Sequence, residues 1–249
     1  MKRFSYLLNT ELSGLLKPVC LIVLFNVAAQ LLLAWLANQS GVRYNRFEGF
    51  YGEAGCITIF CISLLVLLGL LVFHFYSHWW GSKSIYTLMT LPIKRNTAYI
   101  SMLSVFYLVL IFFLATNLVA VVLCYGLFHS QISNVIYPGN VFENGLYLAF
   151  VRSDFLRMLV PLTTEGFFSS LSLLALLPAA VLYGAISERS MRYLNLIPVG
   201  IAFVLMGLTV TRRLNHQGGL LLLTLGMVAF MSFFVWHSLY LIGKNAITG

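Results

Sequence analysis

The chain has 249 residues, of which 60% are hydrophobic and only 9% are charged. This composition excludes a globular protein with an ordinary water-facing surface and predicts a chain that is solvated by lipid. The formal charge of +8 does not indicate nucleic-acid binding, because the Lys and Arg residues lie in short connectors between apolar segments. We therefore expect one polytopic, all-α membrane domain over residues 1–249.

Residues 1–17 have the pattern of an amphipathic helix that lies in the membrane interface. Apolar side chains recur there at helical spacing, at Phe4, Leu8, Leu12, Leu15 and Leu16. Lys17-Pro18 is predicted to end this helix, and the alternative is that it is a short extension of the first span. The segment lacks the apolar run and cleavage site of a signal peptide, so we expect the first span to stay in the mature protein.

Six apolar segments are each long enough to cross the ~30 Å hydrocarbon layer as a helix. These predicted spans are residues 18–37, 55–76, 98–127, 166–186, 193–211 and 218–242. The first connector, through Tyr51 and Glu53, is predicted to be a polar, aromatic loop. Residues 128–165 are predicted to form an extracellular segment, in which 146–160 has the pattern of an interfacial helix.

The basic residues indicate which side of the membrane the termini occupy, since cytoplasmic connectors carry an excess of Lys and Arg. Six spans place both termini on one side, and cytoplasmic termini put nine basic residues in the inner segments and six in the outer ones. The Arg212-Arg213 pair then lies outside, against the rule. The bias nevertheless predicts cytoplasmic N and C termini, in a multi-pass protein of the cytoplasmic membrane.

Four free, buried thiols are expected in place of a disulfide framework, because every cysteine lies in or beside an apolar segment. These cysteines are Cys20, Cys56, Cys61 and Cys124.

The sequence lacks the usual catalytic patterns. An ATPase needs the run G-x-x-x-x-G-K-[ST], and Gly81-Ser82-Lys83-Ser84 has those residue types in the wrong order. His74 and His78 share a helix face, but without a nearby carboxylate or cysteine they are weak evidence for a metal site. No Asp, Glu, Lys or Arg lies at mid-depth in the predicted spans, which disfavours proton relays and aspartyl chemistry. We predict no enzyme activity, no metal and no cofactor bound by this chain.

Neutral amides lie well inside two of the predicted spans: Asn26 and Gln30, one turn apart on the first span, and Asn117 on the third. Buried amides in lipid usually form hydrogen bonds between helices, which is a structural role. The alternative is that these side chains line a substrate path, and the sequence leaves both open.

The connector between the second and third predicted spans carries the most informative pattern. Ser82 or Ser84 can cap a short helix, and Pro92 can end it. Its residues are Ser82, Lys83, Ser84, Ile85, Tyr86, Thr87, Leu88, Met89, Thr90 and Leu91. An amphipathic helix at 82–91 on the cytoplasmic side is suited to docking a soluble partner, and the alternative is an interfacial hairpin without a partner.

With Leu91-Pro92 and the basic pair Lys94-Arg95 after this run, the connector resembles that of the ABC-2 type permeases, the membrane subunits of ATP-binding-cassette exporters. The order of elements is also similar to that family. The resemblance implies that residues 82–91 are a coupling helix that docks on a separate cytosolic ATPase subunit, which binds ATP and magnesium. It also implies a second permease subunit, identical or homologous. The length of the 128–165 segment and the Arg212-Arg213 pair depart from the family pattern.

We therefore expect an export permease for an amphipathic cargo, either a peptide or a lipid-like molecule, since a path without buried charges suits such cargo better than ions. A membrane immunity or assembly factor that transports nothing is the alternative, and an intramembrane enzyme is a third, weaker hypothesis.

Overall fold

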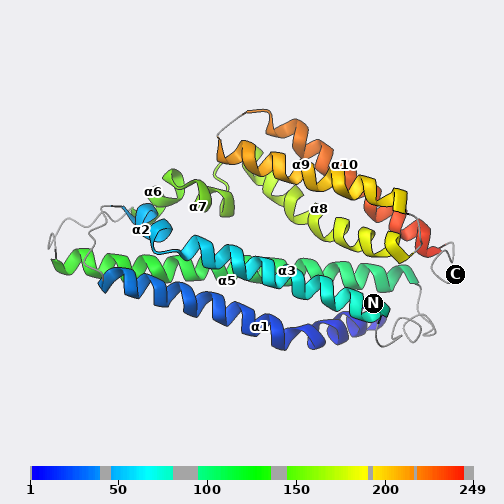
Figure 1. Cartoon of the computed structure of the whole chain (residues 1–249), viewed down its shortest axis with the longest axis horizontal. Helices are drawn as coiled ribbons and strands as arrows, with labels where there is room; N and C mark the ends of the chain where they lie inside the picture. Colours follow the sequence, from blue (N-terminus) through cyan, green and yellow to red (C-terminus); the bar gives the residue numbers. More distant parts are fainter. Residues whose placement is uncertain are drawn as a thin grey trace. The chain divides into compact units, whose positions relative to one another are not determined.

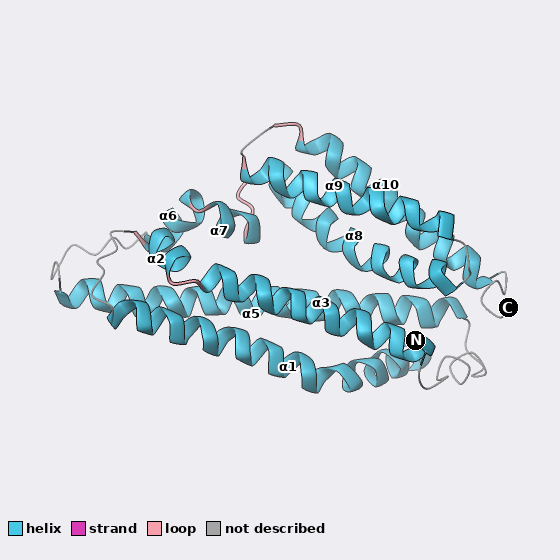
Figure 2. Cartoon of the chain, in the orientation of Figure 1, coloured by secondary structure: helices cyan, strands magenta, loops and turns pink. Residues whose placement is uncertain are grey.

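The computed structural model describes residues 2–39, 46–80, 95–135, 145–189, 193–215 and 218–243, which are almost entirely helical (Figures 1 and 2). The helices are α1 (Lys2–Gln39), α2 (Phe47–Glu53), α3 (Cys56–Trp80), α5 (Arg95–Val135), α6 (Gly145–Arg152), α7 (Asp154–Leu159), α8 (Thr164–Arg189), the 3₁₀ turn η1 (Tyr193–Asn195), α9 (Leu196–Leu214) and α10 (Leu220–Gly243). No strand occurs in these ranges. The predicted all-α class is confirmed for them.

Six of the helices are long and apolar enough to cross a membrane, as the hydropathy pattern predicted. The candidate spans are Phe4–Gln39, Cys56–Ser77, Asn96–Ser130, Thr164–Glu188, Leu196–Leu214 and Leu220–Ile242. Their outward faces are strongly apolar, since Leu222 is 78% exposed and Phe73 is 74% exposed. A surface of this kind is solvated by lipid tails, and by length and composition the chain is a multi-pass membrane protein.

The N-terminal helix differs from the prediction. α1 runs without interruption from Lys2 to Gln39 and contains Pro18, so the predicted helix end at Lys17-Pro18 is wrong. A proline removes one backbone hydrogen bond, and in membrane helices the neighbouring turns tolerate that loss. Continuity of the helix favours the alternative, an extension of the first span, and an interfacial position for residues 1–17 stays a prediction.

Two further elements differ from the predictions. The segment predicted to be a loop before Ala54 contains α2, whose Phe47, Phe50 and Tyr51 are all buried. The helix predicted over 146–160 is instead two short helices, α6 and α7, which are separated at Ser153. The Ser153 side chain accepts a hydrogen bond from the Leu156 backbone N–H, so it caps α7 and begins a new helix.

The described residues fall into two compact units, to both of which α1, α3 and α5 contribute. Unit 1 contains residues 1–17, 69–110 and 163–249. Its core lies between α8, α9 and α10, where small residues such as Ala179, Ala180 and Ala202 are fully buried. Small side chains let membrane helices approach closely, which is how they associate without a hydrophobic driving force.

Unit 2 contains residues 18–68 and 111–162. Its core is aromatic at one end, where Phe47 of α2 lies 5.7 Å from Phe128 and 5.3 Å from Tyr125 of α5 between ring centroids. α2 also packs on α6. The three short helices α2, α6 and α7 therefore share one buried apolar cluster with α1, α3 and α5.

Candidate functional site

A fully buried cluster of polar side chains lies inside unit 2. It joins Asn26 and Gln30 of α1, Asn117 of α5 and Tyr51 of α2, each at most 1% exposed. The Gln30 Nε2 group donates to Asn117 Oδ1 over 2.8 Å and to Asn26 Oδ1 over 3.0 Å. The Asn26 Nδ2 group donates to Asn117 Oδ1 over 3.3 Å. We call these four residues the amide cluster.

Tyr51 completes the amide cluster from outside the spanning helices. Its hydroxyl donates to Gln30 Oε1 over 2.8 Å, and its ring stacks on Phe155 of α7 with 6.2 Å between centroids. Burial raises the pKa of the Tyr51 phenol far above its ordinary value, because an anion there would be desolvated. The phenol therefore stays protonated and remains a donor at every physiological pH.

Gln30 is the hub of the cluster, since both of its amide N–H bonds and its side-chain oxygen are engaged. Its backbone carbonyl also accepts a weak bond from the Cys56 thiol, at 3.7 Å between sulfur and oxygen. One polar atom is left over, because Asn117 Nδ2 is buried and has no hydrogen-bond partner among the described residues.

The structure thus brings together the three amides that the sequence singled out and adds Tyr51, which the sequence placed in a loop. Mutual hydrogen bonds and complete burial favour the structural alternative, a polar lock between α1 and α5. The substrate path stays a prediction. Chemically, the cluster offers neutral donors and acceptors only, so it can recognise a hydrogen-bonding group but cannot exchange protons near neutral pH.

A second polar site lies in unit 1, at the end of α3 that leads into the 81–94 connector. Three successive residues there contact three different helices. His74 Nε2 lies 3.2 Å from Glu11 Oε2 of α1, the Phe75 ring stacks on Phe106 of α5 with 5.5 Å between centroids, and the Tyr76 hydroxyl donates to Glu188 Oε2 of α8 over 2.5 Å. We call this set the α3 junction.

The α3 junction corrects one premise of the sequence analysis. The sequence indicated no carboxylate near His74, whereas Glu11, which lies 63 positions away in sequence and is 8% exposed, is its partner. An ionisable side chain buried among membrane helices, and its partner, are by default candidates for function. No group of three or more His, Cys, Asp or Glu side chains that could hold a metal ion occurs in the part of the chain that the structure describes.

The predicted coupling helix, 82–91, lies outside the described residues, so the assignment of these residues to a coupling helix stays a prediction. The four cysteines are all free: Cys56 and Cys124 are buried, Cys20 is partly exposed and Cys61 is exposed.

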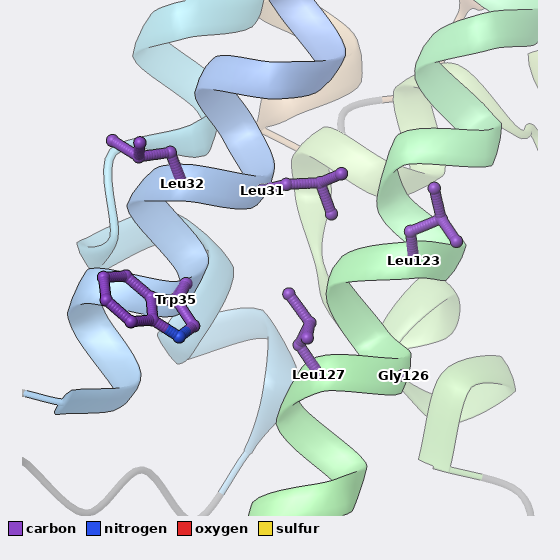
Figure 3. Close-up of a pocket in the computed structure, with 6 residues that line it drawn as sticks. All are labelled: Leu31, Leu32, Trp35, Leu123, Gly126 and Leu127. Carbon is purple, nitrogen blue, oxygen red and sulfur yellow. The ribbon is translucent and has the colours of Figure 1, made fainter.

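An apolar groove of about 560 Å³ lies between α1 and α5 in unit 2 (Figure 3). Its lining consists of Leu31, Leu32, Trp35, Leu123, Gly126 and Leu127. Leu31 and Leu127 point into the space between the two helices, whereas Leu32 and Trp35 point away from it. The amide side chains do not line this groove, so it offers lipid or apolar cargo only dispersion contacts.

Comparisons of the chain with protein-family models, with curated proteins and with solved structures find no match.

Proposed function

We propose that this chain is the permease subunit of an ATP-binding-cassette exporter of the ABC-2 type, in the cytoplasmic membrane. Six candidate spans and the connector pattern through Leu91-Pro92 support the proposal. In this proposal, ATP binding closes two partner ATPases and moves the coupling helix at 82–91. The spans of two permease subunits then change from inward to outward access. The cargo is amphipathic, and the ATPase and its ATP and magnesium belong to other chains.

The α3 junction is the observation that supports the proposal most. A coupling helix can only act on the spans if its attachment point is tied to them. α3 precedes the connector, and within a few residues of its end His74, Phe75 and Tyr76 are tied to α1, α5 and α8. A displacement of the connector would therefore reach three helices through short, directional contacts.

The proposal is tested by co-purification. The membrane protein is tagged, expressed with the ATPases encoded in its own genome, and isolated in mild detergent. We expect a soluble ATPase at a fixed stoichiometry, and we expect Leu88→Asp with Met89→Asp to abolish its retention, because two charges on the apolar face oppose docking in a groove.

The control is Leu194→Asp, which places one such charge on a side chain that is 79% exposed, beside a connector predicted to lie on the same side of the membrane. This variant should keep the ATPase bound. If the double variant retains every partner and all activity, the coupling-helix assignment is wrong. If no ATPase accompanies the unaltered protein, the non-transporting immunity or assembly factor becomes the better hypothesis.

A further inference from the structure

The Arg212-Arg213 pair departs from the positive-inside rule, and the proposed export function gives it no role. Both residues lie in the last turn of α9. That turn is at the end of unit 1 where α8 and α10 begin (Figure 1). The two guanidinium groups are therefore located where three candidate spans end, at the level of the lipid head groups.

Each guanidinium group lies against a different neighbouring element. Arg213 is half-buried, and its Nη1 group donates to Ser170 Oγ of α8 over 2.7 Å. Arg212 Nη1 lies beside Gly219, directly before α10, because a Cβ atom at Gly219 would be only 3.2 Å from it. Gly219 has a φ of +83°, which favours glycine, so this space stays open. The pair thus presents one guanidinium group toward α8 and one toward α10.

The charges at this end of unit 1 suit a single anion. Arg212 forms no hydrogen bond or ion pair within the part of the chain that the structure describes. Glu165, in the first turn of α8, is exposed and forms no ion pair within the same ranges. Two arginines and one glutamate leave an excess of one positive charge, which one phosphodiester group neutralises.

The surface below the two arginines is apolar and faces lipid. Large apolar side chains of all three helices are exposed there: Phe167, Phe168 and Leu171 of α8, Leu208 of α9, and Leu221 and Leu222 of α10. Acyl chains lying on such a surface gain dispersion contacts along their length. This end of unit 1 therefore offers a polar part to a head group and an apolar part to its acyl chains.

We propose that Arg212 and Arg213 bind the phosphate group of a phospholipid whose acyl chains lie on the apolar surface of α8, α9 and α10. Arginine suits this ligand, because its planar guanidinium group can donate two parallel hydrogen bonds to phosphate oxygens. The site prefers head groups without an ammonium group, such as phosphatidylglycerol, since two arginines repel choline or ethanolamine. A bound lipid anion also offsets the positive charge that the predicted orientation places outside.

Two other roles explain less of what is observed. A basic residue in the last turn of a helix interacts favourably with the helix dipole, but that interaction requires neither the contact with Ser170 nor the apolar surface. A soluble phosphate ion would satisfy the guanidinium groups, but it would gain nothing from the exposed apolar side chains. A phospholipid is the ligand that uses both parts of the site.

The test measures lipid binding to the full chain, which is stripped of lipid in a neutral detergent and examined by native mass spectrometry. The protein is titrated with dioleoyl phosphatidylglycerol or with dioleoyl phosphatidylcholine, which differ only in the head group. We expect the first phosphatidylglycerol molecule to bind about tenfold more tightly than the first phosphatidylcholine molecule, because it carries no ammonium group.

Three substitutions locate the effect. Arg213→Gln should weaken binding of phosphatidylglycerol about tenfold, and Arg212→Gln should weaken it about threefold or more, because each removes a charged donor to phosphate. The matched control is Arg152→Gln, at an exposed arginine in the last turn of α6 in unit 2, which should leave the affinity unchanged. If Arg213→Gln fails to fold, Arg212→Gln decides, since that side chain is exposed.

Three outcomes overturn the proposal: equal affinity for the two lipids, unchanged affinity in Arg212→Gln, or an equal loss of affinity in Arg152→Gln. Displacement of bound phosphatidylglycerol by inorganic phosphate at the same concentration also overturns it, because the ligand would then be a soluble anion. The assay contains no ATPase, so the lipid site and the proposed export function can fail independently of each other.

Discussion

At the scale of single residues, the amide cluster depends on Gln30, because its side chain contacts each of the other three members. Gln30→Leu removes the hub and leaves Asn26 Oδ1 and the Tyr51 hydroxyl without the partner they have in the cluster, while Asn117 Oδ1 keeps only the bond from Asn26 Nδ2. Each buried group that loses its partner costs about 1–3 kcal/mol.

We therefore expect Gln30→Leu to lower the free energy of unfolding by about 3 kcal/mol or more, measured by denaturant titration in detergent micelles. The control is Gln39→Leu, the same substitution at an exposed position at the end of α1, which should change stability by less than about 0.5 kcal/mol. Equal effects of the two substitutions would mean that the cluster does not hold α1 to α5.

The raised pKa of Tyr51 predicts that the stability of the folded protein decreases at alkaline pH. Its pKa is raised by burial in the folded state, so the folded protein binds this proton more tightly than the unfolded chain does. The corresponding stability is fully present below the unfolded pKa of about 10 and is lost as the pH rises toward the folded pKa.

The thermal midpoint should thus be insensitive to this group between pH 7 and 9 and should fall above about pH 10. Tyr51→Phe should make that alkaline decrease shallower, whereas Tyr147→Phe, at a tyrosine that is 63% exposed, should leave it as steep as in the unaltered protein. Identical slopes for all three proteins would show that Tyr51 titrates as if it were in water.

The residue scale also shows what the sequence could predict. Asn26, Gln30 and Asn117 are polar residues within apolar runs, so the sequence alone identifies them. The structure brings their side chains together. Glu11 and His74 are equally visible as residues, but their contact joins helices across 63 sequence positions. No local pattern encodes such a pairing, because it depends on how α1 and α3 pack.

At the scale of elements, the hydropathy pattern predicted the six long helices because each contains some 20 mainly apolar residues in succession. The short elements were harder. α2 has two glycines and two phenylalanines in seven residues, so neither propensity nor periodicity favours a helix there. Its aromatic side chains fold against α5, which is a tertiary effect. The sequence pattern also did not predict the break at Ser153, because the spacing of the apolar residues continues across it.

The α3 junction gives the prediction that belongs to this scale. Glu11 and His74 tie α1 to α3 within unit 1, so replacing either should disturb the same contact. In a cycle of Glu11→Gln, His74→Gln and the double variant, we expect a coupling of about 1–3 kcal/mol in the free energy of unfolding.

The control cycle pairs Glu11→Gln with Tyr76→Phe, since the Tyr76 hydroxyl donates to Glu188 on α8. Its substitutions should be additive within about 0.5 kcal/mol. Additivity in both cycles would mean that Glu11 and His74 share no interaction in the membrane, and the junction would then not act through this pair.

At the scale of the whole molecule, the open question is orientation, and Arg213 bears on it. The positive-inside bias predicts cytoplasmic termini, but it places the Arg212-Arg213 pair on the outside. The Arg213 guanidinium donates to Ser170 Oγ of α8 over 2.7 Å, and the residue is part of unit 1. Because the fold holds Arg213 in this contact, its position need not follow the positive-inside rule, which applies to charges in exposed loops.

This argument predicts the outcome of a topology experiment. Green fluorescent protein fused after Gly243 should fluoresce, and alkaline phosphatase inserted between Val160 and Thr164 should be active, because the first folds only inside the cell and the second only outside. Arg212→Gln should leave both signals unchanged or strengthen them, since it removes a positive charge from the outer side. The reverse pattern, a fluorescent protein that stays dark after Gly243 and a phosphatase that is inactive in the segment before α8, would mean that the chain has the opposite orientation in the membrane. The 81–94 connector would then face away from any cytosolic ATPase, so this measurement bears on the orientation and the proposed function together.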